Sequence, residues 1–159
     1  LIKDGAVLVM QGRLPEALES FEEGRLTIES LVKRDPGNAG WQRDLSVALE
    51  SIADTQSRLG KNEDARRSFE SALAIYEALV AKNPDDDNAL VNSLVPHWRL
   101  AVLDPPGARR HLQAALDILK PLARENRLDA ARREWIPRIE AELAAASPRP
   151  APARTPTRR

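Results

Sequence analysis

Cysteine is missing from all 159 residues of the chain, which excludes disulfide frameworks, thiolate catalysis and cysteine-ligated metal. Net charge is missing as well: 24 lysines and arginines balance 24 aspartates and glutamates, so no overall field favours nucleic acid or an anionic membrane. No apolar run approaches the roughly 18 residues that would suggest a membrane span. These absences predict a cytoplasmic protein that binds neither nucleic acid nor membrane.

Motifs for catalysis and ligand chemistry are scarce too. The two histidines, His97 and His111, lie on different predicted helices, and neither has an acidic or hydroxyl partner at a spacing typical of catalysis or metal ligation. We expect surface or structural roles for both. The run Asp85-Asp86-Asp87 lacks the glycine and the glutamate of a calcium loop, so it predicts a helix N-cap. The sequence therefore predicts no catalytic residue, no cofactor and no metal site, and a protein that is not an enzyme.

An internal repeat is the main positive feature of the chain. The segment from Gly12 to Pro36 recurs from Gly60 to Pro84 at a constant shift of 48 positions. The matching pairs are Gly12 and Gly60, Ala17 and Ala65, Phe21 and Phe69, Leu31 and Leu79, Val32 and Val80, and Pro36 and Pro84. A fixed internal period of this kind indicates an architecture of stacked repeats.

Apolar residues within the repeat recur at spacings of three and four, which indicates amphipathic α-helices rather than strands. The second copy has one such stripe on each side of a glycine break at Gly60, so it predicts a helical hairpin. Ala65 and Ala72 are small enough for two helices to approach closely, and Phe69 is expected to fill the space between them.

The sequence as a whole predicts an all-α fold of antiparallel helical hairpins that form one domain over residues 1–146. The predicted hairpins and a final capping helix span about residues 1–35, 38–83, 87–125 and 128–146. The third hairpin comes from a shortened copy of the repeat, shifted by 43 positions from the second. Pro96 is expected to bend or break its first helix, and Pro137 to bend or restart the capping helix.

The tryptophans are either core residues or ligand anchors. Trp41 and Trp135 fall on apolar stripes, which favours core packing. Trp98 lies in the helix that Pro96 disturbs, and the two interpretations are equally open for it.

The last segment, residues 147–159, reads SPRPAPARTPTRR and combines spaced prolines with four arginines. It has no apolar side chain that could offset the entropy of ordering it, so we expect it to be disordered. A basic tether for an acidic partner is the functional alternative.

The pairs Ala17 with Phe21 and Ala65 with Phe69, together with the inter-helix glycines, resemble the tetratricopeptide repeat family. The usual repeat of that family has about 34 residues. The longer period here is more similar to its long-repeat branch, such as kinesin light chain, and to bacterial tandem arrays that carry a tryptophan segment. The resemblance implies a right-handed solenoid whose first helices line a concave face, and that face usually holds an extended peptide.

The resemblance also implies which side chains face a peptide. The concave-face positions on the first helix of the second copy are Arg43, Val47, Glu50, Asp54, Ser57 and Arg58. Chaperone-binding members of the family hold a terminal carboxylate with Lys, Asn and Arg at such positions, whereas Glu50 and Asp54 here predict a preference for neutral or basic segments. A plainer interpretation is an exposed ion pair between Asp54 and Arg58, which contributes only a few tenths of a kcal/mol.

The function expected from this resemblance is that of a protein-interaction scaffold with no enzyme active site, whose partner is a protein or peptide. The alternative is a structural C-terminal cap or self-association segment of a longer signalling or effector protein, with no separate ligand. An enzyme regulatory arm is a third possibility. Exposed apolar side chains at Ile2, Val7 and Val9 would favour the cap or self-association. The pattern begins in mid-repeat at Leu1, so we expect a piece of a longer bacterial protein.

Overall fold

The computed structural model describes residues 2–146, apart from the side chains of residues 2 and 3, and these residues form helices and turns with no strand. The all-α prediction is confirmed. The helices are α1 (Ile2–Met10), α2 (Leu14–Arg34), α3 (Ala39–Arg58), α4 (Asn62–Lys82), α5 (Asp87–Asn92), α6 (Leu94–Leu103), α7 (Ala108–Arg124), α8 (Ala130–Arg133) and α9 (Trp135–Ala145). The disorder predicted for residues 147–159 falls outside the described residues.

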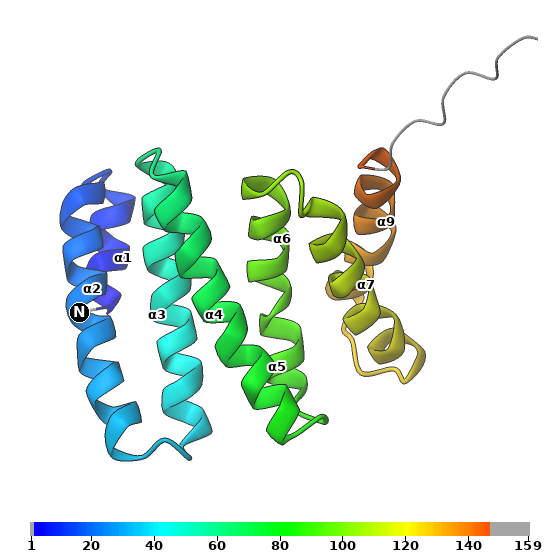
Figure 1. Cartoon of the computed structure of the whole chain (residues 1–159), viewed down its shortest axis with the longest axis horizontal. Helices are drawn as coiled ribbons and strands as arrows, with labels where there is room; N and C mark the ends of the chain where they lie inside the picture. Colours follow the sequence, from blue (N-terminus) through cyan, green and yellow to red (C-terminus); the bar gives the residue numbers. More distant parts are fainter. Residues whose placement is uncertain (1, 147–159) are drawn as a thin grey trace, which may run out of the picture.

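The helical segments lie side by side and run in alternating directions, from α1 and α2 at one end of the molecule to α9 at the other (Figure 1). In this row α5 and α6 form one interrupted segment, and so do α8 and α9. One buried cluster contains Ala17, Phe21 and Ile52, and it joins α2 to α3. Another contains Phe69 and Leu100 and joins α4 to α6. The largest cluster joins α6, α7 and α9. The core is therefore a row of contacts between neighbouring helices.

The repeated residues occupy equivalent places in this core. Ala17 and Ala65 are completely buried, and Phe21 and Phe69 are buried beside them. Ala72 is completely buried as well, as expected for a close helix contact. In the first copy the contact is closer still, because a Cβ added to Gly5 would lie 2.5 Å from Cε1 of Phe21. Only glycine fits at that point of α1 without a shift of the ring.

Three helix–helix connections use the same turn. Gly12 and Gly60 have φ angles of +76° and +75°, and Asn126 has a φ of +60°. In each turn the amide of the following residue donates to a carbonyl five residues earlier, at N···O distances of 2.9, 2.9 and 2.8 Å. This left-handed turn is the usual C-terminal stop of a helix, and asparagine is the residue that replaces glycine there most readily. Asn126 therefore takes the same structural place in its turn as Gly12 and Gly60 do in theirs.

Both predicted proline effects occur, one turn earlier than the proline itself. The helix that contains Pro96 is interrupted at Ser93, between α5 and α6, and the one that contains Pro137 is interrupted at Glu134, between α8 and α9. A proline lacks the N–H that would bond the carbonyl four residues earlier, and its ring crowds that carbonyl. The interruption therefore lies on the N-terminal side, and each proline becomes the third residue of the new helix.

Candidate functional site

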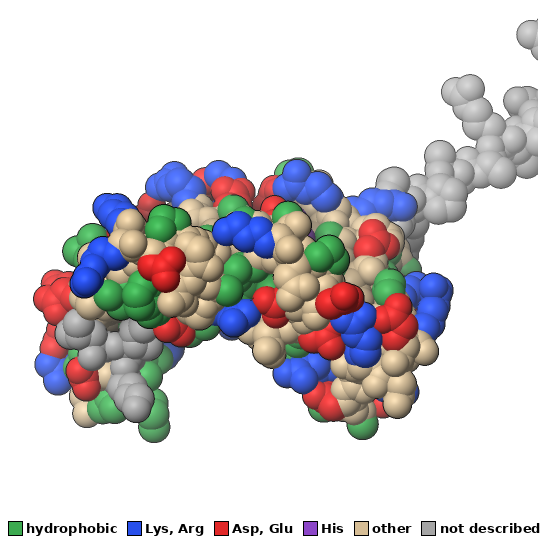
Figure 2. Space-filling model, turned by 90° about the horizontal axis from the view of Figure 1, so that it is seen from below, with side chains coloured by type: hydrophobic (Ala, Val, Ile, Leu, Met, Phe, Trp, Pro, Cys, Tyr) green, Lys and Arg blue, Asp and Glu red, His purple; other side chains and the backbone are tan. Residues whose placement is uncertain are grey.

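The surface is hollowed between the N-terminal and C-terminal ends of the molecule, as Figure 2 shows from below. Two neighbouring hollows are lined by helices α1, α3, α6 and α9. Arg99 of α6 lines both of them, so they adjoin at this side chain, and we call the two together the groove. We name them the N-terminal hollow and the tryptophan hollow.

The N-terminal hollow has a volume of about 540 Å³ and lies between α1, α3 and α6. Its lining residues are Ala6, Val9, Met10, Phe21, Ser51, Asp54, Thr55, Ser57, Arg58 and Arg99. The residues from α1 and α2 are apolar, whereas those from α3 and α6 are polar or charged. The hollow therefore offers an apolar wall opposite a wall of hydroxyl groups, one carboxylate and two guanidinium groups.

The six residues predicted for a concave face separate into two groups. Asp54, Ser57 and Arg58 line the N-terminal hollow. Arg43, Val47 and Glu50 lie further toward the N-terminus of α3 and line neither hollow. The apolar wall from α1 was missed, although the repeat contained a signal for it. A shift of 48 positions maps Asp54, Ser57 and Arg58 onto Ala6, Val9 and Met10, all of which line the hollow.

Asp54 is paired with the next hairpin rather than with its own helix. Its Oδ1 lies 3.1 Å from Nε of Arg99, which comes from α6. Partial burial raises the pKa of the Asp54 carboxyl, and the charges of Arg99 and Arg58 oppose that rise. The i,i+4 pair expected between Asp54 and Arg58 is thus replaced by an ion pair between α3 and α6. The sequence did not predict this pair, because no local pattern places Arg99 beside Asp54. Since Arg99 neutralises Asp54, this carboxylate no longer supports a preference for basic ligands.

Glu50 is likewise engaged by a neighbouring helix. The hydroxyl group of Tyr76 on α4 donates to Oε1 of Glu50 at 2.8 Å. Burial raises the pKa of the Glu50 carboxyl to about 7, while the hydrogen bond from Tyr76 lowers it and the charge of Asp54 adds to the rise. Near neutral pH this carboxyl is therefore only partly ionised, so it is a weak basis for recognising a cationic segment. The predicted preference for basic segments required both acidic residues to be free charges, and both have structural partners.

The tryptophan hollow lies between α6 and α9 and has a volume of about 280 Å³. It is lined by Leu94, Val95, Trp98, Arg99, Trp135, Arg138 and Ile139. Trp98 and Trp135 are half-buried and also pack against the largest core cluster, and the guanidinium carbon of Arg138 lies 4.8 Å from the ring centroid of Trp98. Both tryptophans thus pack against the core and also line the hollow. Trp41, also expected in the core, is half-buried near the start of α3.

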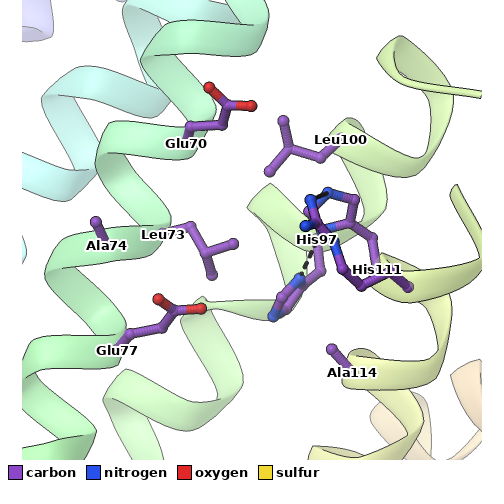
Figure 3. A pocket seen from close by; sticks show the side chains of 9 residues that line it. Glu70, Leu73, Ala74, Glu77, His97, Leu100, His111 and Ala114 are labelled. Carbon is purple, nitrogen blue, oxygen red and sulfur yellow. Dashed lines mark hydrogen bonds between the residues drawn. The ribbon is translucent and has the colours of Figure 1, made fainter. Parts of the chain in front are cut away.

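His97 and His111 form a buried pair, which is consistent with the structural role expected for them. Their Nδ1 atoms lie 3.2 Å apart in a pocket of about 400 Å³, across from Glu70 and Glu77 (Figure 3). The guanidinium of Arg110, which can only donate, lies 3.3 Å from Nε2 of His111. Neutral His111 therefore carries its proton on Nδ1 and donates it to Nδ1 of His97. The two rings come from α6 and α7, so no sequence spacing could have paired them.

Burial and the charges around this pair together lower the pKa of both rings. Burial is the main cause that lowers the pKa of His97, to about 4, with contributions from His111 and Arg110. The pKa of His111 is also lowered, by burial and by Arg110, although Asp104 and Glu70 act in the opposite direction. The arrangement can hold a neutral hydrogen bond, and it disfavours a positive charge on either ring.

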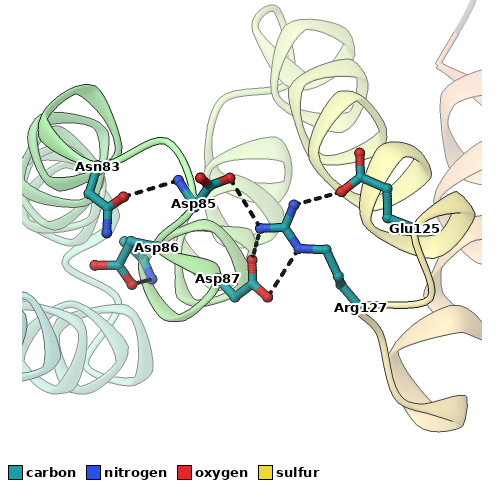
Figure 4. Close-up of polar contacts among 7 residues, drawn as sticks. Asn83, Asp85, Asp86, Asp87, Glu125 and Arg127 are labelled. Atoms are coloured by element: carbon teal, nitrogen blue, oxygen red, sulfur yellow. Dashed lines mark hydrogen bonds and ion pairs between the residues drawn. The ribbon is translucent and has the colours of Figure 1, made fainter.

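The acidic loop before α5 connects three hairpins. Asp86 caps α5, where its side chain accepts an amide N–H at 3.0 Å, and its other oxygen lies 2.8 Å from Nη1 of Arg43. The prediction of an N-cap is confirmed. Asp87 pairs with Arg127, which also binds Glu125 with an N···O distance of 2.6 Å (Figure 4). Arg43, expected to face a peptide, thus binds the adjoining loop instead.

Metal and membrane features are limited. Within residues 2–146, no three histidine, aspartate or glutamate side chains are placed to hold a metal ion. None of the helices in that part of the chain is long and apolar enough to cross a membrane.

No protein-family model, no curated protein and no solved structure matches this chain.

Proposed function

We propose that this chain is a non-enzymatic interaction scaffold, a tetratricopeptide-like right-handed solenoid whose concave groove binds an extended segment of a partner protein. The observation that carries the proposal is the pair of adjoining hollows along α1, α3, α6 and α9, which share Arg99 as a lining residue. The period of 48 residues, the equivalent glycine turns and the equivalent Ala and Phe contacts support the repeat architecture.

The N-terminal hollow fits a segment with one large apolar side chain. Val9, Met10 and Phe21 would receive that side chain, because they form the apolar wall. Met10 is 87% exposed and unbranched, so it can adapt to ligands of different shapes. Ser57 and Arg58 would bind polar groups of the bound backbone from the opposite wall.

A selection from a library of random peptides against the full chain tests this proposal. A selected peptide is then measured against two matched variants, Met10→Glu and Leu26→Glu. Both positions are exposed and apolar, but only Met10 lines the groove, while Leu26 of α2 is 57% exposed elsewhere. We expect Met10→Glu to weaken binding at least about tenfold, as loss of a buried anchor does, and Leu26→Glu to leave it unchanged.

Equal effects of the two variants would place the ligand outside the groove, and a selection that enriches no binding peptide would overturn the proposal. Circular dichroism of both variants checks that each keeps its helical spectrum.

A second candidate function, self-association or capping of further repeats, is favoured by the exposed apolar surface of α1. Val7 is 51% exposed and lines neither hollow. Val9 is half-buried and packs on the first core cluster, and the side chain of Ile2 lies outside the described residues. Sedimentation of the chain and of its Val7→Glu variant tests this candidate. A dimer that Val7→Glu dissociates would support it, whereas a monomer at high concentration would exclude self-association.

A further inference from the structure

The tryptophan hollow has the chemistry of a site for a proline-rich segment. Two half-buried tryptophans, Trp98 and Trp135, line it from facing helices, and Val95 at its rim is 38% exposed. Aromatic grooves bind proline-rich chains because the proline rings pack flat on the indole faces, and because an extended polyproline II segment loses little entropy on binding.

The chain itself contains such a segment, and it begins next to this hollow. Residues 147–159 include Pro148, Pro150, Pro152 and Pro156. The segment directly follows α9 and its C-cap Ala146, and α9 supplies Trp135, Arg138 and Ile139 to the hollow. A segment tethered this closely has a high effective concentration, so even weak contacts are sufficient to hold it.

The segment is also long enough to reach the hollow. Trp135 lies at the start of α9 and Ala145 at its end, which separates them by roughly 15 Å at the α-helical rise. Thirteen residues in a polyproline II conformation would span about 40 Å. After a reversal beyond Ala146, the prolines at positions 150 and 152 could therefore lie beside the two tryptophans.

Charge favours the same placement. The segment carries four arginines and no acidic residue. The helix along which it would run carries Glu140 and Glu142 against the single Arg138, and Glu134 precedes it. Arg138 is already occupied by the ring of Trp98 and lies 3.9 Å from Glu142. Glu140 is paired with Lys120 at 2.6 Å, so the carboxylates that remain for the arginines of the segment are those of Glu134 and Glu142.

We propose that residues 147–159 fold back along α9 of the same chain and place their prolines in the tryptophan hollow. The segment then occupies the tryptophan hollow at the C-terminal end of the groove. This inference does not depend on the function proposed above, because it concerns only this chain.

Contact quenching tests the proposal in the full chain. Because the chain has no cysteine, an Ala153→Cys substitution takes a single label, a dye whose emission is quenched only on contact with tryptophan. We expect emission about twofold or more below that of the same dye on the free peptide SPRPAPARTPTRR, which corresponds to a segment docked at least half of the time. Trp98→Phe and Trp135→Phe should restore emission, whereas Trp41→Phe, at a tryptophan outside the hollow, should not.

A matched pair of valine variants keeps the test valid if a tryptophan variant fails to fold. Val95→Glu at the rim of the hollow should restore emission, and Val102→Glu should not, because Val102 of α6 is 67% exposed and does not line the hollow. Excess unlabelled SPRPAPARTPTRR should also restore emission, and the same peptide with glycine in place of each proline should not.

Three results would overturn the proposal. Emission equal to that of the free labelled peptide would show that the segment does not dock. Quenching that persists in Trp98→Phe, Trp135→Phe and Val95→Glu would place it elsewhere. Quenching that disappears on dilution would show that the occupant is the segment of a second copy, not that of the same chain.

Discussion

His97 and His111 share one hydrogen bond between their Nδ1 atoms, 3.2 Å apart, and Arg110 determines which ring donates it. A proton added to either ring has no favourable place. On His97 it would set two N–H groups against each other, and on His111 it would point at the guanidinium of Arg110. The contact between α6 and α7 therefore favours the neutral form of both imidazole rings.

His97 should stay neutral at pH 6, where an ordinary histidine is largely protonated, and His111 should be less protonated there than an ordinary histidine. The pKa of His97 lies near 4 and that of His111 is also lowered. As pH falls below about 6.5, the two imidazole rings bind protons in the unfolded chain but not yet in the folded chain. The free energy of unfolding therefore falls between about pH 6.5 and pH 4. Above pH 6.5 the pair makes no pH-dependent contribution. Titration of the imidazole Cε1–H signals by NMR measures this directly, and a midpoint near 6.5 for both rings would contradict it.

Glu50→Gln should stabilise the protein at pH 8 and not at pH 4. The pKa of Glu50 is raised to about 7, so between pH 4.5 and 7 the unfolded chain loses this proton before the folded chain does. The wild-type protein thus loses stability as pH rises through that window, and the variant avoids the loss. We expect a gain of roughly 1–2 kcal/mol at pH 8, once the partial exposure of the carboxyl is allowed for.

Denaturant unfolding at the two pH values measures this difference, and a variant that is less stable than wild type at both would refute the assignment. Because the Glu50 and histidine trends oppose each other, the Glu50→Gln background also isolates the histidine contribution.

Gly5→Ala should destabilise the first hairpin, by about 1–3 kcal/mol, because the new methyl group overlaps a buried ring that has little room to move. The added Cβ would lie 2.5 Å from the ring of Phe21. Gly37→Ala is the matched control, since its Cβ meets an aspartate oxygen at an ordinary 3.4 Å. Thermal unfolding compares the two, and equal melting temperatures for both variants would show that α1 does not approach Phe21 closely.

Ala65→Leu and Ala72→Leu should each cost about 1–3 kcal/mol through overpacking of the helix contact. Both alanines are completely buried on α4, whereas Ala81 on the same helix is exposed. Ala81→Leu should therefore change the free energy of unfolding by less than about 0.5 kcal/mol. Urea unfolding of the three variants is the measurement, and a neutral pair at positions 65 and 72 would disprove the close contact.

Sequence reasoning succeeded where the cause is local and failed where it is tertiary. The helices, the turns at Gly12 and Gly60 and the cap at Asp86 follow from spacing, backbone freedom and side-chain hydrogen bonds within a few residues. The pairing of Asp54 with Arg99 joins residues 45 positions apart, for which no periodic signal exists. The interruption of a helix near each proline was predicted from the chemistry of proline, but the exact position of the interruption, one turn before the proline, was not.

The reason for that miss is the direction of the helical hydrogen bond. The carbonyl left without a donor by Pro96 belongs to Asn92, four residues earlier, where α5 ends. Of the ten residues that line the N-terminal hollow, the positions predicted on α3 supplied three, Asp54, Ser57 and Arg58. Applying the same register to α1 would have added Val9 and Met10.

Arg99 is a single guanidinium that serves two hollows, and this sharing makes the hollows thermodynamically linked. A ligand that draws Arg99 toward the tryptophan hollow removes it from the N-terminal hollow and from its salt bridge to Asp54. By reciprocity, the factor by which the first ligand changes the affinity of the second equals the factor by which the second changes that of the first. The groove is therefore expected to show negative cooperativity between its ends, transmitted by one side chain without any movement of the helices.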